Sequence, residues 1–283
     1  MQKNIGKLLL QYLLPHHAVS RLAGMVANCK IKLLKNFLIK KFINHYQVNM
    51  EEAAESNPEN YPTFNSFFTR ALKPDARKII ASATEIISPV DGTISQIGNI
   101  EKDNLLQAKG KQYTLQKLLV MPEIAASFQD GKFVTIYLSP KDYHRIHMPI
   151  PGKLQQMLHV PGTLFTVNEL AVQNIAQVFG RNERVISVFE TLAGPMAVVF
   201  VGAMIVGSIA TKWHGIVAPP CKKFPQTWRY TDQNIILQRG DEVGHFQLGS
   251  TVILLFAKNA AEWLNTLKRN DAVKMGQILG EIK

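Results

Sequence analysis

Cysteine is scarce in this chain: Cys29 and Cys221 are the only two, and they lie far apart without a CxxC pair. No signal peptide with an apolar centre and a small-residue cleavage site opens the chain, so we expect reduced thiols and cytosolic chemistry. The sequence also lacks low-complexity tracts and any repeat with a period of roughly 20 to 50 residues, which excludes repeat and disordered proteins. With 283 residues and 46% hydrophobic content, the chain can bury a full core.

Acidic residues are missing from positions 1–50, whereas eight basic residues are present there: Lys3, Lys7, Arg21, Lys30, Lys32, Lys35, Lys40 and Lys41. Of the net charge of +11, only +3 is left for the other 233 residues. The basic character therefore belongs to an N-terminal segment and not to the whole surface.

Apolar residues recur within this basic segment at spacings of 3, 4 and 4, at Ile31, Leu34, Leu38 and Phe42. The spacing predicts a basic amphipathic helix, a type that lies in membrane interfaces, where each basic residue adds about 1 kcal/mol near an anionic surface. A helix packed on the protein's own core, with its lysines in solvent, is the alternative. Nucleic acid is disfavoured because no recognised binding motif accompanies the charge. We assign residues 1–60 to a membrane-binding segment and residues 61–283 to a catalytic core.

Residues 51–60 reverse the charge and read as a hinge into the stretch 63–70. Three phenylalanines in that stretch predict a short helix packed onto the core. Arg70 at its end suits either an anionic ligand or a structural salt bridge.

Charge is also absent from residues 191–211, a run long enough to span a membrane. We reject that interpretation because Gly194-Pro195, Gly202 and Gly207 interrupt a run rich in valine and isoleucine, which favours a pair of buried strands. The following residues, 213–230, read as a functional loop or lid. Trp213 and Trp228 in this loop suit contact with substrate or lipid as well as core packing.

The rest of the chain is mostly of β type from Ile79 onward. We expect strands beside an Asp91-Gly92 turn, helices over 115–128 and 168–179, a turn and strand over 271–282, and further strands over 132–138, 154–160 and 184–190. The predicted fold is α+β, with a β-rich sandwich or barrel-like core whose turns resemble the hairpins of biotinyl/lipoyl-type domains. The amphipathic helical segment precedes that core.

One peptide bond, Gly249-Ser250, lies between a polar turn and the apolar run 251–256. Glycine can adopt the strained backbone that a serine needs to attack its own preceding carbonyl, and Thr251 supplies a second hydroxyl for the developing oxyanion or ester. A plain turn before a strand is the simpler alternative. A hydrolase of the nucleophile-elbow type is disfavoured because residues 248–252 are not Gly-x-Ser-x-Gly.

Two histidines, His144 and His147, lie three residues apart in a polar loop that ends at a proline. They suit bonding to backbone carbonyls, a metal site that lacks a third ligand, or acid/base catalysis. A serine nucleophile needs a base and an orienting carboxylate, and Asp91, His147 and Ser250 supply that set. Asp91 alone would read as a turn residue.

Four motifs in this order resemble those of bacterial phosphatidylserine decarboxylases: Thr63-Phe64-Asn65-Ser66-Phe67-Phe68-Thr69-Arg70, Pro89-Val90-Asp91-Gly92, Tyr143-His144-Arg145-Ile146-His147-Met148-Pro149 and Leu248-Gly249-Ser250-Thr251. The resemblance extends over nearly the whole chain, including the basic N-terminal segment. It is more specific than any one motif, because four separate motifs match.

The resemblance implies a proenzyme that cuts itself before Ser250. Asp91 would orient His147, and His147 would take the proton of Ser250 as its oxygen attacks the Gly249 carbonyl. Ser250 would then become a covalent pyruvoyl cofactor on a small chain, 250–283, beside a large chain, 1–249.

The resemblance also implies the reaction. The pyruvoyl ketone would form a Schiff base with phosphatidylserine and accept the electrons released with CO2, giving phosphatidylethanolamine in phospholipid biosynthesis. His144 would bind the serine carboxylate or supply a proton. No metal and no nucleic acid are expected. The implied enzyme is peripheral to the anionic cytoplasmic face of the cell membrane, and a homo-oligomer stays open.

Three other functions remain open from the residues alone. A lipoyl-like binding module with a basic membrane arm would keep an intact chain. A soluble hydrolase that uses Asp91, His147 and Ser250 on another molecule would show no self-cleavage. A metal enzyme acting through His144 and His147 would lose activity with chelators.

Overall fold

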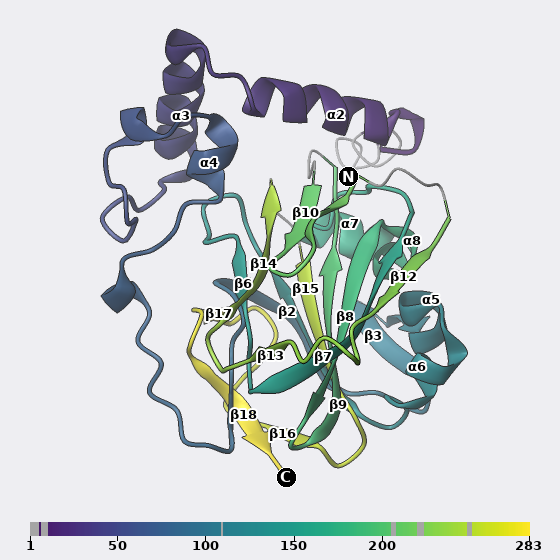
Figure 1. The fold of residues 1–283 in the computed structure, drawn as a ribbon. Helices are drawn as coiled ribbons and strands as arrows, with labels where there is room; N and C mark the ends of the chain where they lie inside the picture. The colour runs from purple at the N-terminus through teal and green to yellow at the C-terminus, as the bar shows by residue number, and fades with distance from the viewer. Residues whose placement is uncertain (1–5, 7–10, 109, 205–207, 220–223, 248–250) are drawn as a thin grey trace.

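A broad antiparallel sheet forms the centre of the computed structural model, which describes residues 6, 11–108, 110–204, 208–219, 224–247 and 251–283. The described residues give it these nine strands: β2 (Gly92–Asn99), β5 (Lys132–Tyr137), β7 (Gly152–Val160), β8 (Arg184–Thr191), β9 (Gly194–Val201), β12 (Gln226–Arg229), β13 (Ile236–Leu237), β15 (Thr251–Phe256) and β17 (Ala272–Val273). Their order is β12-β7-β8-β9-β15-β5-β2-β17, with β13 beside β7 (Figure 1).

The most apolar segments form the middle of this sheet. Every residue of β15 is buried, and so are the last six residues of β9. Such runs are typical of strands that are covered on both faces. A two-residue turn at Leu192 and Ala193 joins β8 to β9, and Gly194 follows it with a φ of 83°, which favours glycine.

Smaller sheets pack around the large one. A four-stranded sheet of order β11-β10-β14-β6 contains β6 (Arg145–His147), β10 (Ser208–Thr211), β11 (Gly215–Ala218) and β14 (Glu242–Gln247). A three-stranded sheet contains β1 (Glu85–Ile87), β18 (Ile278–Ile282) and β16 (Ala261–Trp263), and a two-stranded sheet contains β3 (Asn104–Ala108) and β4 (Lys111–Thr114). These counts refer to the described residues.

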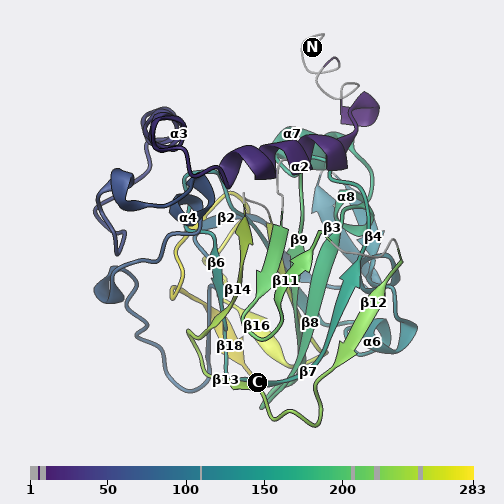
Figure 2. The same cartoon turned by 45° about the horizontal axis from the view of Figure 1, so that its top comes forward.

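The helices of the described chain are short apart from the first two. They are α2 (His16–Ala27), α3 (Lys32–Tyr46), α4 (Phe64–Phe68), α5 (Leu115–Leu119), α6 (Pro122–Ala126), α7 (Glu169–Asn174) and α8 (Val178–Arg181), with 3-10 turns η1 (Pro58–Asn60) and η2 (Pro74–Ala76). Figures 1 and 2 both place α2 across one end of the large sheet, with α3 and α4 beside it.

A second, smaller apolar core holds these N-terminal helices together. It contains Ala27, Ile39, Val48, Tyr61, Phe64, Phe67 and Phe68. The short helix expected over 63–70 is thus confirmed as α4, and its three phenylalanines are buried. A capping box at Thr63 and Ser66 fixes where this helix begins.

The helix expected from the basic segment is present as α3, and Leu38 and Phe42 of the predicted apolar stripe pack against the small core. Ile31, in the predicted apolar stripe, is 64% exposed, whereas Lys35 is buried and donates to Asn36 and to the carbonyl of Glu59. The buried face is instead centred on Ile39. Packing against α4 therefore shifted the buried face of the helix away from part of the stripe that the spacing predicts.

Several other expectations need correction. The large sheet is open, so no barrel closes among the described strands. The strands beside Asp91 do not form a hairpin, because β1 pairs with β18 and β2 pairs with β5 and β17. At the start of β2, a Cβ on Gly92 would lie 2.5 Å from the Tyr137 carbonyl oxygen, which explains why glycine occupies this close approach.

The predicted strands over 191–211 exist as β9 and β10, but they belong to different sheets and do not pair with each other. The region 213–230, expected as a loop, contains the short strands β11 and β12. Trp213 and Trp228 pack against the main core.

Both longer predicted helices of the core are divided in two. Val120, with a φ of 66°, and Pro122 separate α5 from α6, while Gln177, with a φ of 54°, separates α7 from α8. A residue with such a φ cannot continue a right-handed helix. No helix in the described ranges is long and apolar enough to cross a membrane.

Candidate active site

One end of the large sheet gathers the predicted site residues. Thr93 of β2 and Thr251 of β15 are both in register with Tyr137, the last residue of β5. Asp91 directly precedes β2, and Thr251 is the residue that follows Ser250 in the sequence. The predicted cleavage pair, Gly249 and Ser250, lies outside the described residues.

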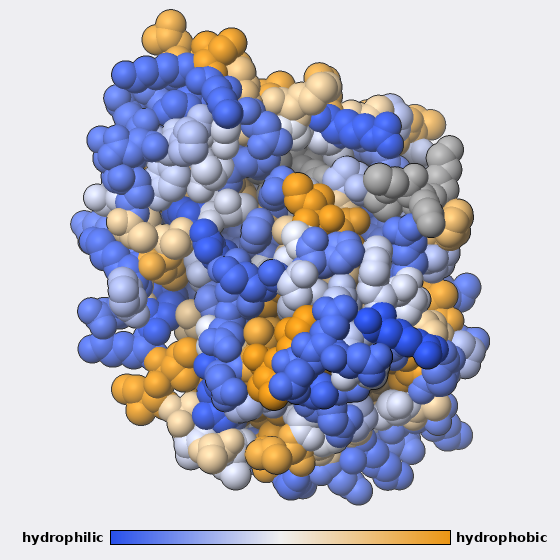
Figure 3. Space-filling model, in the orientation of Figure 1, coloured by the Kyte–Doolittle hydropathy of each residue, from blue (hydrophilic) through white to orange (hydrophobic). Residues whose placement is uncertain are grey.

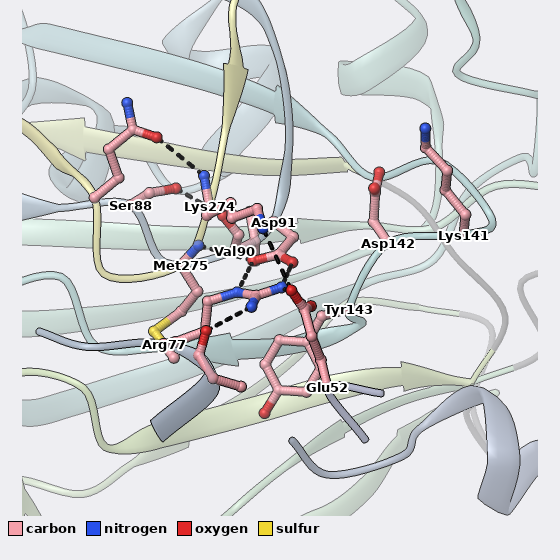
Figure 4. A network of polar contacts seen from close by, with 12 residues as sticks. Glu52, Arg77, Ser88, Val90, Asp91, Lys141, Asp142, Tyr143, Lys274 and Met275 are labelled. Carbon is pink, nitrogen blue, oxygen red and sulfur yellow. Dashed lines mark hydrogen bonds and ion pairs between the residues drawn. The ribbon is translucent and has the colours of Figure 1, made fainter. Parts of the chain in front are cut away.

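The carboxylate of Asp91 is held by an arginine that the sequence did not single out. Arg77 Nε donates to Asp91 Oδ1 at 2.9 Å, and Arg77 Nη2 donates to Asp91 Oδ2. The backbone N–H of Met275 also donates to Oδ1, at 2.8 Å. Figure 4 shows the guanidinium lying against the carboxylate. Asp91 is 7% exposed, so this is a nearly buried, bidentate ion pair.

Arg77 also connects the helical segment to this pair. Its Nη2 donates to Glu52 Oε2 at 2.8 Å, and Glu52 Oε1 lies 3.4 Å from Lys274 Nζ. Burial works against the charge of Arg77, but hydrogen bonds and charges from Asp91 and Glu52 outweigh it and raise the pKa of the guanidinium. The cation therefore stays charged between two carboxylates.

His147 is fixed by its backbone and by both ring nitrogens. Its backbone N–H donates to the Pro89 carbonyl at 2.8 Å, two residues before Asp91. Ring Nδ1 lies 2.7 Å from the Gly240 carbonyl, and Nε2 lies 2.9 Å from the Tyr143 hydroxyl. A carbonyl only accepts, so Nδ1 carries the proton. Burial lowers the pKa of His147, which keeps the ring neutral near pH 7, with Nε2 as an acceptor from Tyr143.

Asp91 and His147 are therefore near neighbours with different partners. Between these two described side chains there is no hydrogen bond, because Arg77 holds one and Gly240 and Tyr143 hold the other. The negative charge of Asp91 still favours the protonated form of His147. The triad of Asp91, His147 and Ser250 stays a prediction.

His144 is completely buried and its ring stacks on that of Phe68, with 4.1 Å between ring centroids and 22° between planes. Burial, together with the charge of Arg70, lowers the pKa of His144 to about 3. The carbonyls of Ser139 and Pro140 favour the charged form, but the ring nitrogens have no partner in hydrogen-bond geometry among the described residues. His144 is thus a neutral imidazole with unused polar atoms.

Arg70 does not form the salt bridge that we considered for it. Within the described ranges it has no ion pair, and its Nη2 donates to the Lys141 carbonyl at 3.0 Å. Burial lowers the pKa of this guanidinium, which also lies 5.6 Å from the ring centroid of Phe67. Arg70 therefore joins α4 to the loop that leads to His144.

Sequence reasoning missed Arg77 because residues 71–84 form an irregular connection without apolar periodicity. Tyr143 belongs to the motif of residues 143–149, but its spacing from His147 did not indicate a contact between the two side chains. Asp142, next to it, accepts from the backbone N–H and hydroxyl of Ser139, both at 2.7 Å, and burial raises the pKa of its carboxyl.

The described part of the chain offers no further ligands for a metal held by both histidines, because no group of three or more His, Cys, Asp or Glu residues that could hold a metal comes together there. His144 faces Phe68, whereas His147 faces Tyr143 and Gly240.

Known proteins match this chain over almost its full length. A family model described as phosphatidylserine decarboxylase matches residues 64–281, and a second, described as PSD, matches residues 7–47. Proteins named phosphatidylserine decarboxylase proenzyme are similar to it in Saccharophagus degradans (50% identity over 275 residues, 97% of this chain and 96% of the relative) and in Azotobacter vinelandii (50% over 278 residues, 97% of each). A third, in Idiomarina loihiensis, is 48% identical over 281 residues, 98% of this chain and 96% of the relative. The chain therefore belongs to the phosphatidylserine decarboxylase family.

Proposed function

We propose that this chain is a proenzyme that cleaves itself between Gly249 and Ser250 and then converts phosphatidylserine to phosphatidylethanolamine and CO2. Family membership supports the reaction. The observation that carries the assignment of residues is the shared end of the sheet, where Asp91, His147 and Thr251 come together.

The neutral imidazole of His147 supports its role as the base for self-cleavage. Once the Tyr143 hydroxyl turns away from it, Nε2 takes the proton of the Ser250 hydroxyl as that oxygen bonds to the Gly249 carbonyl carbon. The carbon–nitrogen bond then breaks, and the proton passes to the freed amine, which leaves an ester. Elimination releases the Gly249 carboxylate and leaves dehydroalanine, which takes up water and loses ammonia to become a pyruvoyl group.

Asp91 contributes its negative charge to this step. It favours the imidazolium that forms when His147 accepts the proton. Arg77 and the Met275 N–H hold the carboxylate, so Asp91 does not bond to the ring of His147 while the Arg77 pair is closed. In that state Asp91 influences His147 through its charge, and the backbone bond from His147 to Pro89 keeps the two residues close.

The residues around position 250 fit a pyruvoyl group. The Thr251 hydroxyl and both ring nitrogens of His144 are buried polar atoms without partners in the described part of the chain, and such atoms suit a carbonyl or a carboxylate. When present, the group supplies a ketone that binds the substrate amine and draws off the electrons released with CO2. His144 then holds the substrate carboxylate or delivers a proton after it leaves.

The two chains produced by cleavage would stay together. The small chain, 250–283, includes β15, which pairs with β5 on one side and β9 on the other over six residues each. The same chain supplies β16, β17 and β18. Removing it would open the middle of the large sheet.

The helical segment supports a peripheral position on the anionic, cytoplasmic face of the cell membrane. Large apolar residues of α2, α3 and the turn between them are exposed at Leu22, Met25, Ile31, Leu33 and Phe37. Figure 3 shows apolar residues gathered along this edge of the molecule. Exposed apolar groups beside lysines are typical of helices that lie in a membrane interface.

Intact-mass spectrometry under denaturing conditions tests the proposal. The normal chain should give a fragment with the mass of residues 250–283 minus one ammonia, whereas Ser250→Ala should stay whole. Ser127→Ala, at an exposed serine, should cleave like the normal chain. The cleaved protein should release CO2 from phosphatidylserine vesicles. An intact, folded normal chain would favour a binding module or a hydrolase that acts on other molecules.

A further inference from the structure

A cavity of about 910 Å³ lies between the N-terminal helices and the end of the large sheet. Its roof is α2, which Figures 1 and 2 show across that end. Helices α3 and α4 form one side, and the end of β5 with residues that follow β5, β7 and β9 forms the floor. Among the described residues the lining contains no charged side chain: it comprises Val19, Leu22, Ala23, Val26, Ala27, Leu38, Phe42, Tyr46, Phe64, Phe68, Tyr137, Leu138, Pro140, Thr166, Val167, Asn168, Ala203 and Met204.

The inner end of this cavity reaches the candidate active site. Phe68 lines the cavity and stacks on His144. Tyr137 also lines it, and its backbone is in register with Thr251, the neighbour of the predicted cofactor residue. A molecule in the cavity would therefore lie beside the reacting groups.

The outer end opens at the apolar surface of the helical segment. Leu22 and Val26 line the cavity and are still 60% and 41% exposed. Apolar atoms thus continue from the exposed face of α2 to the interior. A hydrocarbon chain that passed along this path would stay in contact with apolar groups over its length.

Polar contacts beside the cavity hold its roof in place. The side chain of Gln11, which precedes α2, accepts from the N–H and hydroxyl of Thr166 at 3.1 and 2.9 Å. Beyond the other end, the side chain of Asn28 accepts from Asn65 at 2.8 Å. The cavity is therefore bounded by a helix that is bonded to the core at one end and to α4 at the other.

We propose that this cavity binds one acyl chain of the diacyl phospholipid, so that the lipid is partly withdrawn from the bilayer while its head group reacts. This rests on the proposed function, because the head group must reach position 250. An uncharged lining suits a hydrocarbon chain and not a second polar head group. One chain is held, and the other stays in the membrane against the exposed side of α2 and α3.

The first test fills the cavity from its roof. Ala23 lines the cavity, whereas Ala18 is an exposed alanine of the same helix and does not line it, so Ala18→Trp is the matched control. Ala23→Trp should lower kcat/KM for dioleoyl phosphatidylserine about tenfold, because each methylene kept from apolar contact weakens binding several-fold. Dihexanoyl phosphatidylserine, whose chains reach less far, should change less than about twofold.

Three outcomes of this test are distinct. If Ala23→Trp lowers kcat/KM equally for both substrates, or changes kcat/KM for neither, the acyl chain does not occupy the cavity. If Ala18→Trp has the same selective effect, the outer surface of α2 selects chain length and the cavity does not. Self-cleavage is scored by mass in every variant, and its loss in the normal chain would count against the proposed function and not against this site.

A second measurement needs no substitution. Vesicles containing phosphatidylserine with a diazirine at the end of one acyl chain are mixed with the normal protein and irradiated. Labelled peptides should include residues 22–30, which carry Ala23 and Val26, or residues around Val167 and Met204. Label confined to Leu33 and Phe37 on the outer side of α3 would show that both chains stay in the bilayer and would overturn the proposal.

Discussion

The helical segment and the β-rich core place the same residue types in opposite surroundings. Leu33 and Phe37 of α3 are 85% and 61% exposed, whereas Leu254 and Phe256 of β15 are completely buried. Hydrophobic burial drives folding, so apolar residues left outside in a cluster point to a surface with another use. The core buries its apolar residues around one end of the sheet, whereas the segment leaves apolar and basic groups on its surface.

The two regions meet where the chemistry is expected. Phe68, from the small core, stacks on His144. Arg77 binds Glu52 on the helical side and Asp91 on the other. The reacting end of the sheet is therefore completed by residues from the N-terminal region, and four variants separate the contributions of the two regions.

The largest effect should follow from His147→Gln, which changes the core alone. Glutamine cannot accept a proton, so self-cleavage should slow by about 10²- to 10⁴-fold, the usual contribution of a general base. Vesicle binding should be unchanged because the helices are untouched. Mass spectra over time measure the first effect, and sedimentation with vesicles measures the second. His214→Gln, at an exposed histidine, is the control, and a normal cleavage rate in His147→Gln would remove His147 from the mechanism.

Arg77→Gln should break the connection between the regions. The Arg77 and Asp91 side chains are only 6% and 10% exposed, and removing one partner of a buried pair costs about 3–5 kcal/mol of unfolding free energy. Without its cation, Asp91 should act more strongly on His147, so the pKa of His147 should rise and the pH profile of self-cleavage should move upward.

Arg269→Gln supplies the matched control for this measurement. Its pair with Glu169 is exposed, with side chains 36% and 67% accessible, and such pairs contribute at most about 1 kcal/mol. Denaturant unfolding and the pH profile of cleavage are measured for both variants. If Arg77→Gln lowers stability but leaves the pH profile in place, Arg77 is structural only.

The pH dependence of stability should report on His144, where the two regions touch. The pKa of His144 falls from 6.5 to about 3 on folding, so the unfolded chain binds the proton more readily between these values. This contribution to stability is complete above pH 6.5 and is lost as the pH falls toward 3. Its loss raises the unfolding equilibrium constant about tenfold for each pH unit of acidification. His144→Phe keeps a ring against Phe68 and should reduce this slope by one proton. An unchanged slope would mean that the folded ring is charged.

Local sequence patterns predicted where strands and helices lie better than which of them pair or pack together. The runs in β9 and β15 identified buried strands because burial on both faces requires unbroken apolar sequence. The lipoyl-like hairpins were not found, since the partners of β1 and β2 lie far away in the sequence. Motifs brought Asp91, His144 and His147 to notice, but the contacts of Arg77 and Tyr143 depend on tertiary packing, which no spacing encodes. The side that α3 turned inward was decided in the same way.

The smallest effect should come from lysines of the helical segment, and it separates the regions by charge alone. Lys35 and Lys40 are bonded to Glu59, which leaves Lys32 and Lys41 as exposed lysines of α3 without an ion pair in the described part of the chain. Each lysine near an anionic bilayer contributes about 1 kcal/mol, so Lys32→Gln with Lys41→Gln should weaken binding to anionic vesicles about 30-fold.

The control for charge is the pair Lys258→Gln and Lys268→Gln, two exposed lysines of the core. It removes the same charge from the region that is not expected to touch the membrane. Salt screens exposed charges, so the difference between the two double variants should shrink as ionic strength rises. Self-cleavage should be normal in both. Equal weakening by both pairs would mean that the whole protein attracts the bilayer through its net charge. The helical segment and the core would then differ in how their apolar residues pack, and not in whether they bind the membrane.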